Sequence, residues 1–317
     1  TPRARKARGP LTPGAPGGKP RPMRPDVLCI GAVLWDVIGR APVAMALGDD
    51  VPGRIQRLPG GVALNIALTL GRLGLRPAVL TAVGDDAEGE ELLAAISARG
   101  VLADFAHRSA GMPTDRYMAV EGAGGLVAAV ADAHTLEAAD EAILLPLADG
   151  RLATAEAPWR GPVALDGNLT DDLLARLARS PLLAAADLRV APASPGKALR
   201  LLPLLGHPGA TLYVNLIEAA ALVGRPLAHA TEAAGALVAA GCRRALVTDG
   251  AREAADGDRD GVLAFAPPPV TARRVTGAGD TFLAAHVVAE RGGASRGDAL
   301  ARAVRAAAAF VGGEEPA

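Results

Sequence analysis

Short apolar runs alternate along this chain with segments whose apolar residues recur at helical spacing. The apolar runs have the length of buried strands and lie at 27–31, 77–83, 161–166, 188–191, 211–214 and 245–248. Residues 61–73 and 85–99 are typical of helices, and Gly74 and Gly100 follow them as helix ends. Alternating strands and helices predict an α/β fold with a mainly parallel sheet covered by helices on both faces.

One region departs from this alternation. Residues 116–121 and 126–131 flank a glycine-rich turn at 122–125, which predicts a β-hairpin. Residues 35–46 show no helical periodicity, and we expect them to pair with the hairpin. The two parts predict a small β-lid beside the main sheet, formed by segments at about 35–58 and 113–132.

Composition limits the class of protein. Half of the residues are hydrophobic, so the chain can bury a large core. Lys plus Arg (33) nearly balance Asp plus Glu (34), which argues against nucleic acid as a partner. No apolar run reaches the roughly 18 residues of a membrane helix, and no secretory leader is visible. With only Cys29 and Cys242 there is no disulfide framework, so we expect a cytoplasmic protein.

The first 25 residues differ from the rest of the chain. They are rich in Pro, Gly, Arg and Lys, and contain no acid. Such a segment cannot bury a core, so we expect a flexible arm ahead of one folded domain at 26–317. The arm is either a plain tail, a wrongly assigned start, or a basic segment that binds an acidic surface.

The strongest chemical signal is TGAGD at 276–280, followed by an apolar helical run at 283–288. Its glycines therefore lie at a helix N-terminus, where unpaired N–H groups and the helix dipole attract anions. Asp280 in the first turn points a carboxylate into the same space, where it could take a proton from an attacking hydroxyl. Taken alone, the motif is equally typical of a tight turn capped by Asp280. It is neither a dinucleotide fingerprint nor a P-loop.

Three further motifs change this balance. They are PGGVALN at 59–65, NLIE at 215–218 and VTDG at 247–250. In this order, and with TGAGD, they resemble the signature elements of the ribokinase-like, or PfkB, carbohydrate kinase family. The resemblance covers roughly 26–311. It implies a three-layer α/β/α fold and transfer of the ATP γ-phosphoryl group to a primary hydroxyl, with Mg²⁺ as the metal.

The resemblance also assigns roles on the acceptor side. Asp280 would be the catalytic base, and the N–H groups of Gly277, Ala278 and Gly279 would stabilise the transferring phosphoryl group. The remaining acceptor-side assignments are substrate contacts and fall on Asp36, Gly60, Gly61 and Asn65. A carboxylate and an amide suit the vicinal hydroxyls of a ribose.

On the nucleotide side, the family pattern places Asn215 and Glu218 near Mg²⁺. Their spacing puts them on one helical turn, and Mg²⁺ keeps several waters, so few protein ligands are needed. A plain polar helix start would explain the same pair. Thr248 and Gly250 would face the nucleotide at the end of a strand, with Asn168 as a further phosphate-side candidate. We expect adenine near the helix at about 301–310.

Within the family, the likeness is greatest to pseudouridine kinases. It rests on VPGRI at 51–55, on the hairpin at 117–132, and on APAS at 191–194 with Lys197. Ala191 and Leu64 depart from that pattern, and Glu253 departs from the family's nucleotide-side turn, which would repeat Gly there. Arg274 stands where the family usually has an Asp, which helps to hold a monovalent cation in several members. Potassium activation is therefore in doubt, and one hypothesis is that the guanidinium replaces the ion.

Three functions are open at this point. The first is a kinase that converts pseudouridine to its 5′-phosphate, and the second is a kinase of another nucleoside or of a sugar such as ribose. The third is a nucleotide- or sugar-binding regulatory protein without catalysis. Exposed lid strands could also pair between subunits and give a homodimer.

Overall fold

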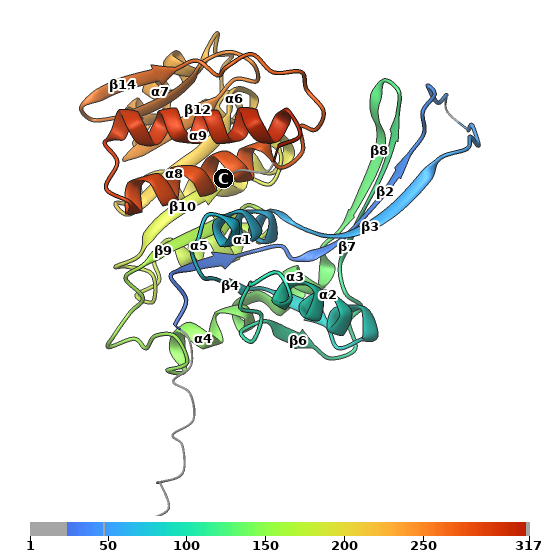
Figure 1. Cartoon of the computed structure of the whole chain (residues 1–317). Helices are drawn as coiled ribbons and strands as arrows, with labels where there is room; N and C mark the ends of the chain where they lie inside the picture. Colours follow the sequence, from blue (N-terminus) through green and yellow to red (C-terminus); the bar gives the residue numbers. More distant parts are fainter. Residues whose placement is uncertain (1–23, 47, 315–317) are drawn as a thin grey trace, which may run out of the picture.

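The computed structural model describes residues 24–46 and 48–314, so nearly all of the arm expected at 1–25 lies outside the described residues. The main sheet has the strand order β14-β13-β12-β11-β10-β9-β1-β4 (Figure 1). Its parallel strands are β1 (Val27–Ile30), β4 (Pro77–Leu80), β9 (Pro162–Asp166), β10 (Asp187–Ala191), β11 (Ala210–Asn215) and β12 (Arg244–Thr248). The mainly parallel α/β architecture is thus confirmed, as are the expected strands other than the run at 77–83.

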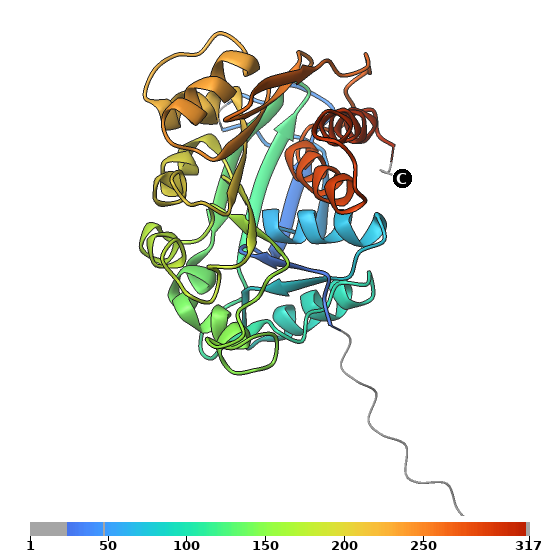
Figure 2. The same ribbon diagram turned by 90° about the vertical axis from the view of Figure 1, so that its left-hand side faces the viewer.

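Successive side chains of the main sheet point to opposite faces and pack into two separate hydrophobic cores. In β1, Val27 and Cys29 pack into one core, whereas Leu28 and Ile30 pack into the other. The first core includes side chains of α1 (Val62–Arg72), α2 (Ala87–Ser97), α8 (Ala278–Arg291) and α9 (Arg296–Val311). The second includes side chains of α3 (His134–Ala139), η1 (Asp140–Leu144), α4 (Leu145–Ala148), α5 (Asp171–Leu177), η2 (Pro195–Leu204), α6 (Leu216–Val223) and α7 (Ala230–Ala239). Figure 2 shows helices on both sides of the sheet.

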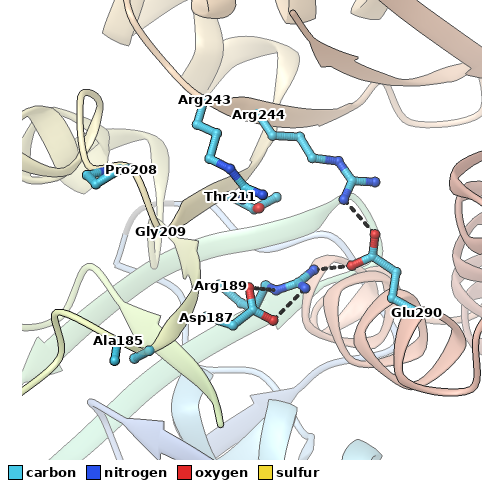
Figure 3. Close-up of a pocket in the computed structure, with 10 residues that line it drawn as sticks. Ala185, Asp187, Arg189, Pro208, Gly209, Thr211, Arg243, Arg244 and Glu290 are labelled. Atoms are coloured by element: carbon cyan, nitrogen blue, oxygen red, sulfur yellow. Dashed lines mark hydrogen bonds and ion pairs between the residues drawn. The ribbon is translucent and has the colours of Figure 1, made fainter. Parts of the chain in front are cut away.

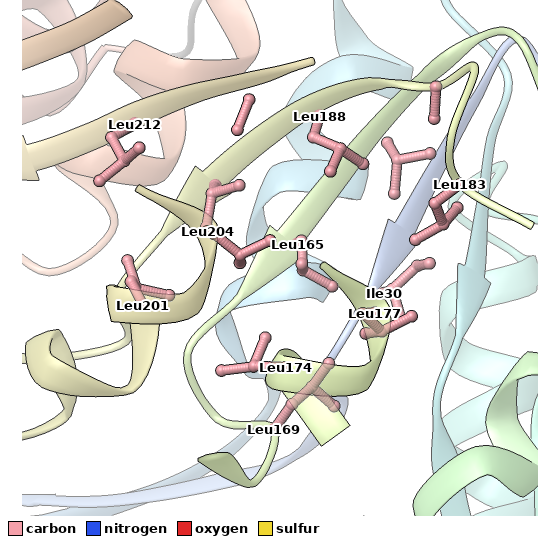
Figure 4. Packing of buried hydrophobic residues seen from close by; sticks show 14 of the residues in the cluster. Ile30, Leu165, Leu169, Leu174, Leu177, Leu183, Leu188, Leu201, Leu204 and Leu212 are labelled. Atoms are coloured by element: carbon pink, nitrogen blue, oxygen red, sulfur yellow. The ribbon is translucent and has the colours of Figure 1, made fainter. Parts of the chain in front are cut away.

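Leucine fills the second core in place of aromatic residues, which make up only 3% of the chain. Leu165, Leu188 and Leu212 project from three neighbouring strands, and all three are completely buried (Figure 4). Leu174 and Leu201 meet them from α5 and η2. This packing holds α5 and η2 at a fixed position along the strands, relative to the carboxyl ends of β9, β10 and β11. Within the described residues, no helix is long and apolar enough to cross a membrane.

A second, four-stranded sheet stands beside the main body in Figure 1. Its strand order is β3 (Arg54–Gly60), β2 (Leu34–Arg40), β7 (Arg116–Gly122) and β8 (Gly125–Asp132). The β7–β8 pair is the expected hairpin, and β2 pairs with β7 in parallel. Every residue of β8 except Asp132 is exposed, so this strand leaves a long edge uncovered.

Two parts of the sheet differ from the sequence-based expectation. The run at 77–83 is not one strand: β4 ends at Leu80, and β5 (Ala82–Gly84) leaves the main sheet to pair with β6 (His107–Ser109). The sheet also continues into an unexpected antiparallel hairpin, β13 (Ala254–Asp258) and β14 (Gly261–Phe265). The sequence of β13, AADGD, has the composition of a turn, and its pairing with β12 makes it a strand.

Candidate active site

The carboxyl ends of the parallel strands gather most of the residues that sequence analysis singles out. β9 ends at Asp166 two residues before Asn168, and β11 ends at Asn215. Asn215 and Thr248 are register partners in neighbouring strands. Ligands of open α/β sheets bind at this edge, so the fold places these residues where chemistry is expected.

Asp280 is held by a hydrogen bond from a distant helix. It lies in the first turn of α8, which packs against α1. The Asn65 side-chain amide on α1 donates to Asp280 Oδ2 at 3.0 Å, and Asp280 forms no salt bridge within the described residues. Its second oxygen, Oδ1, makes no hydrogen bond to the described part of the chain. The carboxylate is therefore oriented on one side and available on the other.

The surroundings of Asp280 make it a stronger base than an ordinary aspartate. Burial raises its pKa to about 7, and the negative charges of Asp166, Asp36 and Glu218 act in the same direction. The hydrogen bond from Asn65 opposes this rise. A carboxyl group with a pKa near neutrality can accept a proton from a hydroxyl and later release it.

The amides before Asp280 are only partly as expected. Gly277 begins α8 with a φ of 91°, a conformation that favours glycine. The Ala278 amide donates to the Val275 carbonyl oxygen at 3.0 Å, so it is occupied in this structure. The amides of Gly277, Gly279 and Asp280 make no backbone hydrogen bond to a described residue. At the N-terminus of α8, the amides without a backbone partner among the described residues are therefore those of Gly277, Gly279 and Asp280, and Ala278 is not one of them.

Asp36 lies directly against Gly60, the first of the two glycines before α1. A Cβ atom at Gly60 would lie 2.0 Å from Asp36 Oδ2, so only glycine allows this carboxylate to lie against the backbone. Gly61 has a φ of 100°, and a Cβ atom there would lie 2.3 Å from the Ala32 carbonyl oxygen. Burial raises the pKa of Asp36 to about 6. Asp36 and the two glycines thus form a closely packed, acidic surface next to α1.

Asn215 and Glu218 form a capping box at the start of α6. Asn215 Oδ1 accepts from the Glu218 amide at 2.9 Å, and Glu218 Oε2 accepts from the Asn215 amide at 2.8 Å. Burial raises the pKa of Glu218 to about 7. No group of three or more His, Cys, Asp or Glu residues in the described ranges could hold a metal. The pair is thus a polar helix start, and Glu218 Oε1 makes no hydrogen bond within the described residues.

The nucleotide-side candidates spread along the sheet. Thr248 ends β12, three strand spacings or about 14 Å from β9. Gly250 follows in a turn with a φ of 58°. Asn168 accepts a hydrogen bond from Lys197 Nζ at 2.7 Å. Lys197 is the only lysine among the described residues, and burial lowers its pKa.

Asp166 is a residue of this region that the sequence analysis does not assign. It is completely buried, and its carboxylate accepts hydrogen bonds from the amides of Ala32, Ala63 and Asn168. Its position could have indicated a role in the site, because Asp166 is the polar residue that ends the apolar run at 161–166.

Arg274 contacts the end of α9. Its Nε donates to the Phe310 carbonyl oxygen and its Nη2 to the Glu314 carbonyl oxygen, each at 2.9 Å. The guanidinium also lies 3.8 Å from the centre of the Phe310 ring. A Cβ atom at Gly277 would meet the same ring at 3.0 Å. The loop before α8 therefore rests on the last turn of α9.

A cavity of about 460 Å³ lies at the opposite end of the strands (Figure 3). Arg189, Arg244 and Glu290 line it, and both arginines are paired with Glu290. Glu290 is ten residues, or about 15 Å, further along α8 than Asp280. None of the residues expected in the catalytic site lines this cavity.

Comparisons with known proteins agree with these motifs. A sequence profile described as pfkB family carbohydrate kinase matches residues 24–316. The pseudouridine kinase of Escherichia coli K12 is 29% identical over 266 residues, which are 81% of each chain. The bifunctional protein HldE of Hyphomonas neptunium is 30% identical over 315 residues, 90% of this chain but only 60% of that relative. The structure of Arabidopsis thaliana ribokinase complexed with ribose and ATP matches with a TM-score of 0.71 at 22% identity, over 91% of this chain and 93% of the other.

The raised pKa of Asp280 predicts a pH-dependent loss of stability. Between the ordinary pKa of 3.8 and about 7, the folded protein binds a proton that the unfolded chain releases. Stability contributed by this group therefore falls as pH rises through that window. We expect Asp280→Asn to raise the free energy of unfolding at pH 8 by about 1–3 kcal/mol, allowing for partial solvent access.

Urea unfolding at pH 5 and pH 8 measures this effect, and the gain should be larger at pH 8. The exposed Asp104 provides a matched control, because Asp104→Asn should change stability little and equally at both pH values. A variant at 280 that is less stable than the unmodified protein at pH 8 would contradict the electrostatic description of the site.

Proposed function

Because this chain belongs to the pfkB family of carbohydrate kinases, we propose that it transfers the γ-phosphoryl group of ATP to the 5′-hydroxyl of a nucleoside, with pseudouridine as the acceptor. One observation carries the proposal: Asp280 has a raised pKa and an available oxygen at the N-terminus of α8, beside unoccupied amides. A protein that only binds nucleotide has no need of such a base. Catalysis is therefore favoured over the regulatory alternative.

The proposed reaction assigns one task to each group. Asp280 accepts the proton of the acceptor hydroxyl, whose oxygen forms a bond to the γ-phosphorus while the bond to the bridging oxygen of ADP breaks. The amides of Gly277, Gly279 and Asp280 donate to the phosphoryl oxygens at the positive end of the α8 dipole. Mg²⁺, when bound, would neutralise phosphate charge, and Glu218 Oε1 would hold it through water. Thr248, Gly250 and Asn168 would contact the nucleotide.

The charges around Asp280 favour an uncharged acceptor. The carboxylates of Asp36, Asp166 and Glu218 raise its pKa, and no cation opposes them among the main influences. The phosphate of a phosphorylated sugar would bring further negative charge close to these carboxylates. Asp36 and Asn65 can bind ribose hydroxyls, which suits a nucleoside and, as the second candidate, ribose itself. The likeness to a pseudouridine kinase supports the nucleoside.

Two wider features follow from this proposal. ATP as co-substrate places the reaction in the cytoplasm. The uncovered edge of β8 offers backbone groups to a second copy, so we propose that the small sheet closes over the acceptor and pairs between the subunits of a homodimer.

A panel of acceptors tests the proposed function directly. We expect ATP-dependent phosphorylation with kcat/KM highest for pseudouridine, lower for uridine, adenosine and ribose, and lowest for fructose 6-phosphate. Product formation is followed by mass spectrometry and ADP release. A preference for fructose 6-phosphate would contradict the argument that the charges around Asp280 favour an uncharged acceptor. If none of the five acceptors is phosphorylated, the proposed kinase reaction is wrong.

Removing the base should abolish most of the turnover. We expect Asp280→Asn to fold and to lower kcat by at least ~10²-fold, the scale of general-base catalysis. In the unmodified enzyme, kcat should rise with pH through about 7, because Asp280 must be deprotonated to accept a proton. Steady-state kinetics from pH 5 to 9 measure both effects, with Asp104→Asn as the control. Near-normal turnover of the 280 variant would refute its role.

Arg274 leads to a prediction about monovalent cations. Its guanidinium donates to two main-chain carbonyl oxygens, at Phe310 and Glu314, which are groups that a cation would otherwise coordinate. We propose that this charge takes the place of a monovalent ion. Replacing K⁺ by tetramethylammonium at constant ionic strength should then change kcat less than about twofold, which we take to mean that catalysis does not depend on K⁺.

Arg274→Ala should lower kcat about tenfold by loosening the loop before α8, on the scale expected when a catalytic group is displaced. K⁺ should restore part of this loss. Arg99→Ala is the matched control, because Arg99 Nη1 also donates to a main-chain carbonyl oxygen, that of Ala95 at 2.7 Å, outside the residues assigned to the site, and this variant should leave kcat unchanged. Strong K⁺ dependence of the unmodified enzyme would overturn the replacement hypothesis.

A further inference from the structure

Asp166 is the most deeply buried acid near the candidate site, and the proposed reaction leaves it without a role. The side chain has no exposed surface and forms no salt bridge within the described residues. Its charge is met instead by backbone amides. Oδ2 accepts from Ala32 at 2.9 Å and from Ala63 at 3.0 Å, and Oδ1 accepts from Asn168 at 2.8 Å.

These three amides belong to three separate segments. Ala32 lies in the bend between β1 and β2, which leads to Asp36. Ala63 lies in the first turn of α1, directly after Gly60 and Gly61 and two residues before Asn65. Asn168 follows β9 and accepts from Lys197. A single carboxylate thus joins the backbone of the acceptor side to that of the phosphate side.

The fit around this carboxylate is tight. A Cβ atom at Gly31 would lie 2.3 Å from Asp166 Cγ, and Gly31 has a φ of 145° that side chains rarely adopt. Only glycine at position 31 leaves room for the Asp166 carboxylate to accept hydrogen bonds from all three amides. Hydrogen bonds from amides to a charged acceptor are stronger than those between neutral groups.

On the basis of the proposed function, we propose that Asp166 is a positioning residue of the phosphoryl-transfer site. Its carboxylate fixes the bend after β1, the first turn of α1 and Asn168 relative to one another. Through α1 it also sets the position of Asn65, and therefore the orientation of Asp280 towards the acceptor hydroxyl.

Two variants separate the position of this carboxylate from its charge. Asp166→Asn keeps the shape but turns one acceptor into a donor, so at least one of the three amides loses its partner. Gly31→Ala keeps the charge and displaces the carboxylate. We expect both variants to lower kcat by about 10- to 100-fold, as small displacements of reacting groups do. The KM for ATP should change less than kcat does, because Asp166 fixes only Asn168 among the proposed nucleotide contacts and makes no hydrogen bond to Thr248 or Gly250.

The pH profile supplies a readout that a purely structural role would not move. The charged groups that act on Asp280 are Asp36 from β2, Asp166 from β9 and Glu218 from α6, with Lys197 of η2 acting on Asp166. Removing the Asp166 charge should move the acid limb of kcat to lower pH. Gly31→Ala should leave the limb in place.

Asp115 provides the matched control. It is 3% exposed and accepts from the amides of Thr135 and Leu136, each at 2.9 Å, at the start of α3. Asp115→Asn should lower the melting temperature much as Asp166→Asn does, but leave kcat within twofold. The proposal is overturned if Asp166→Asn also keeps kcat within twofold and leaves the acid limb unshifted. If Asp166→Asn does not fold, Gly31→Ala decides by the same kcat criterion.

Failure of the proposed function gives a different result. An unmodified protein that phosphorylates no acceptor overturns the kinase reaction and the catalytic part of this inference together. Hydrogen exchange then tests the structural part: Asp166→Asn should speed exchange of the Ala32, Ala63 and Asn168 amides at least tenfold and leave Thr135 and Leu136 unchanged. Unchanged exchange at the first three amides would overturn that part as well.

Discussion

The hydrogen bond from Asn65 to Asp280 joins two helices that are 215 residues apart in the sequence. In the proposed reaction, a base that must meet a hydroxyl needs a fixed direction, and this bond supplies it to Asp280 from outside α8. α1 and α8 can meet because both pack in the same core, on one face of the parallel sheet. The order of the strands and the core that α1 shares with α8 hold this contact in place.

The site brings like charges together at a cost to stability. The charges of Asp36, Asp166 and Glu218 raise the pKa of Asp280, and burial raises the pKa of all four groups. Such an arrangement persists only where the surrounding structure determines it. Here the amides that bind Asp166 and the capping box of Glu218 absorb part of the charge. The two continuous cores on either side of the sheet supply the remaining stability.

Much of the fold could be predicted from the apolar runs, because the buried parallel strands β1, β9 and β12 are short and carry apolar residues at their central positions. The β13 strand could not, since its polar sequence forms a strand only through pairing with β12. Similarly, the run at 77–83 gives no sign that Thr81 separates two sheets. In the site, the motif identified Asp280, but its partner Asn65 and the role of Asp166 depend on long-range contacts. Local sequence also could not show that a turn occupies the Ala278 amide.

The contact between the loop before α8 and the last turn of α9 has a consequence for how the protein is made. Arg273 and Arg274 donate through their amides to Val311, and Phe310 packs against Gly277. During translation, Asp280 leaves the ribosome about thirty residues before this support exists. The growing polypeptide therefore carries Asp280 while the loop before α8 still lacks its support, and this loop is fixed only when α9 has emerged and docked.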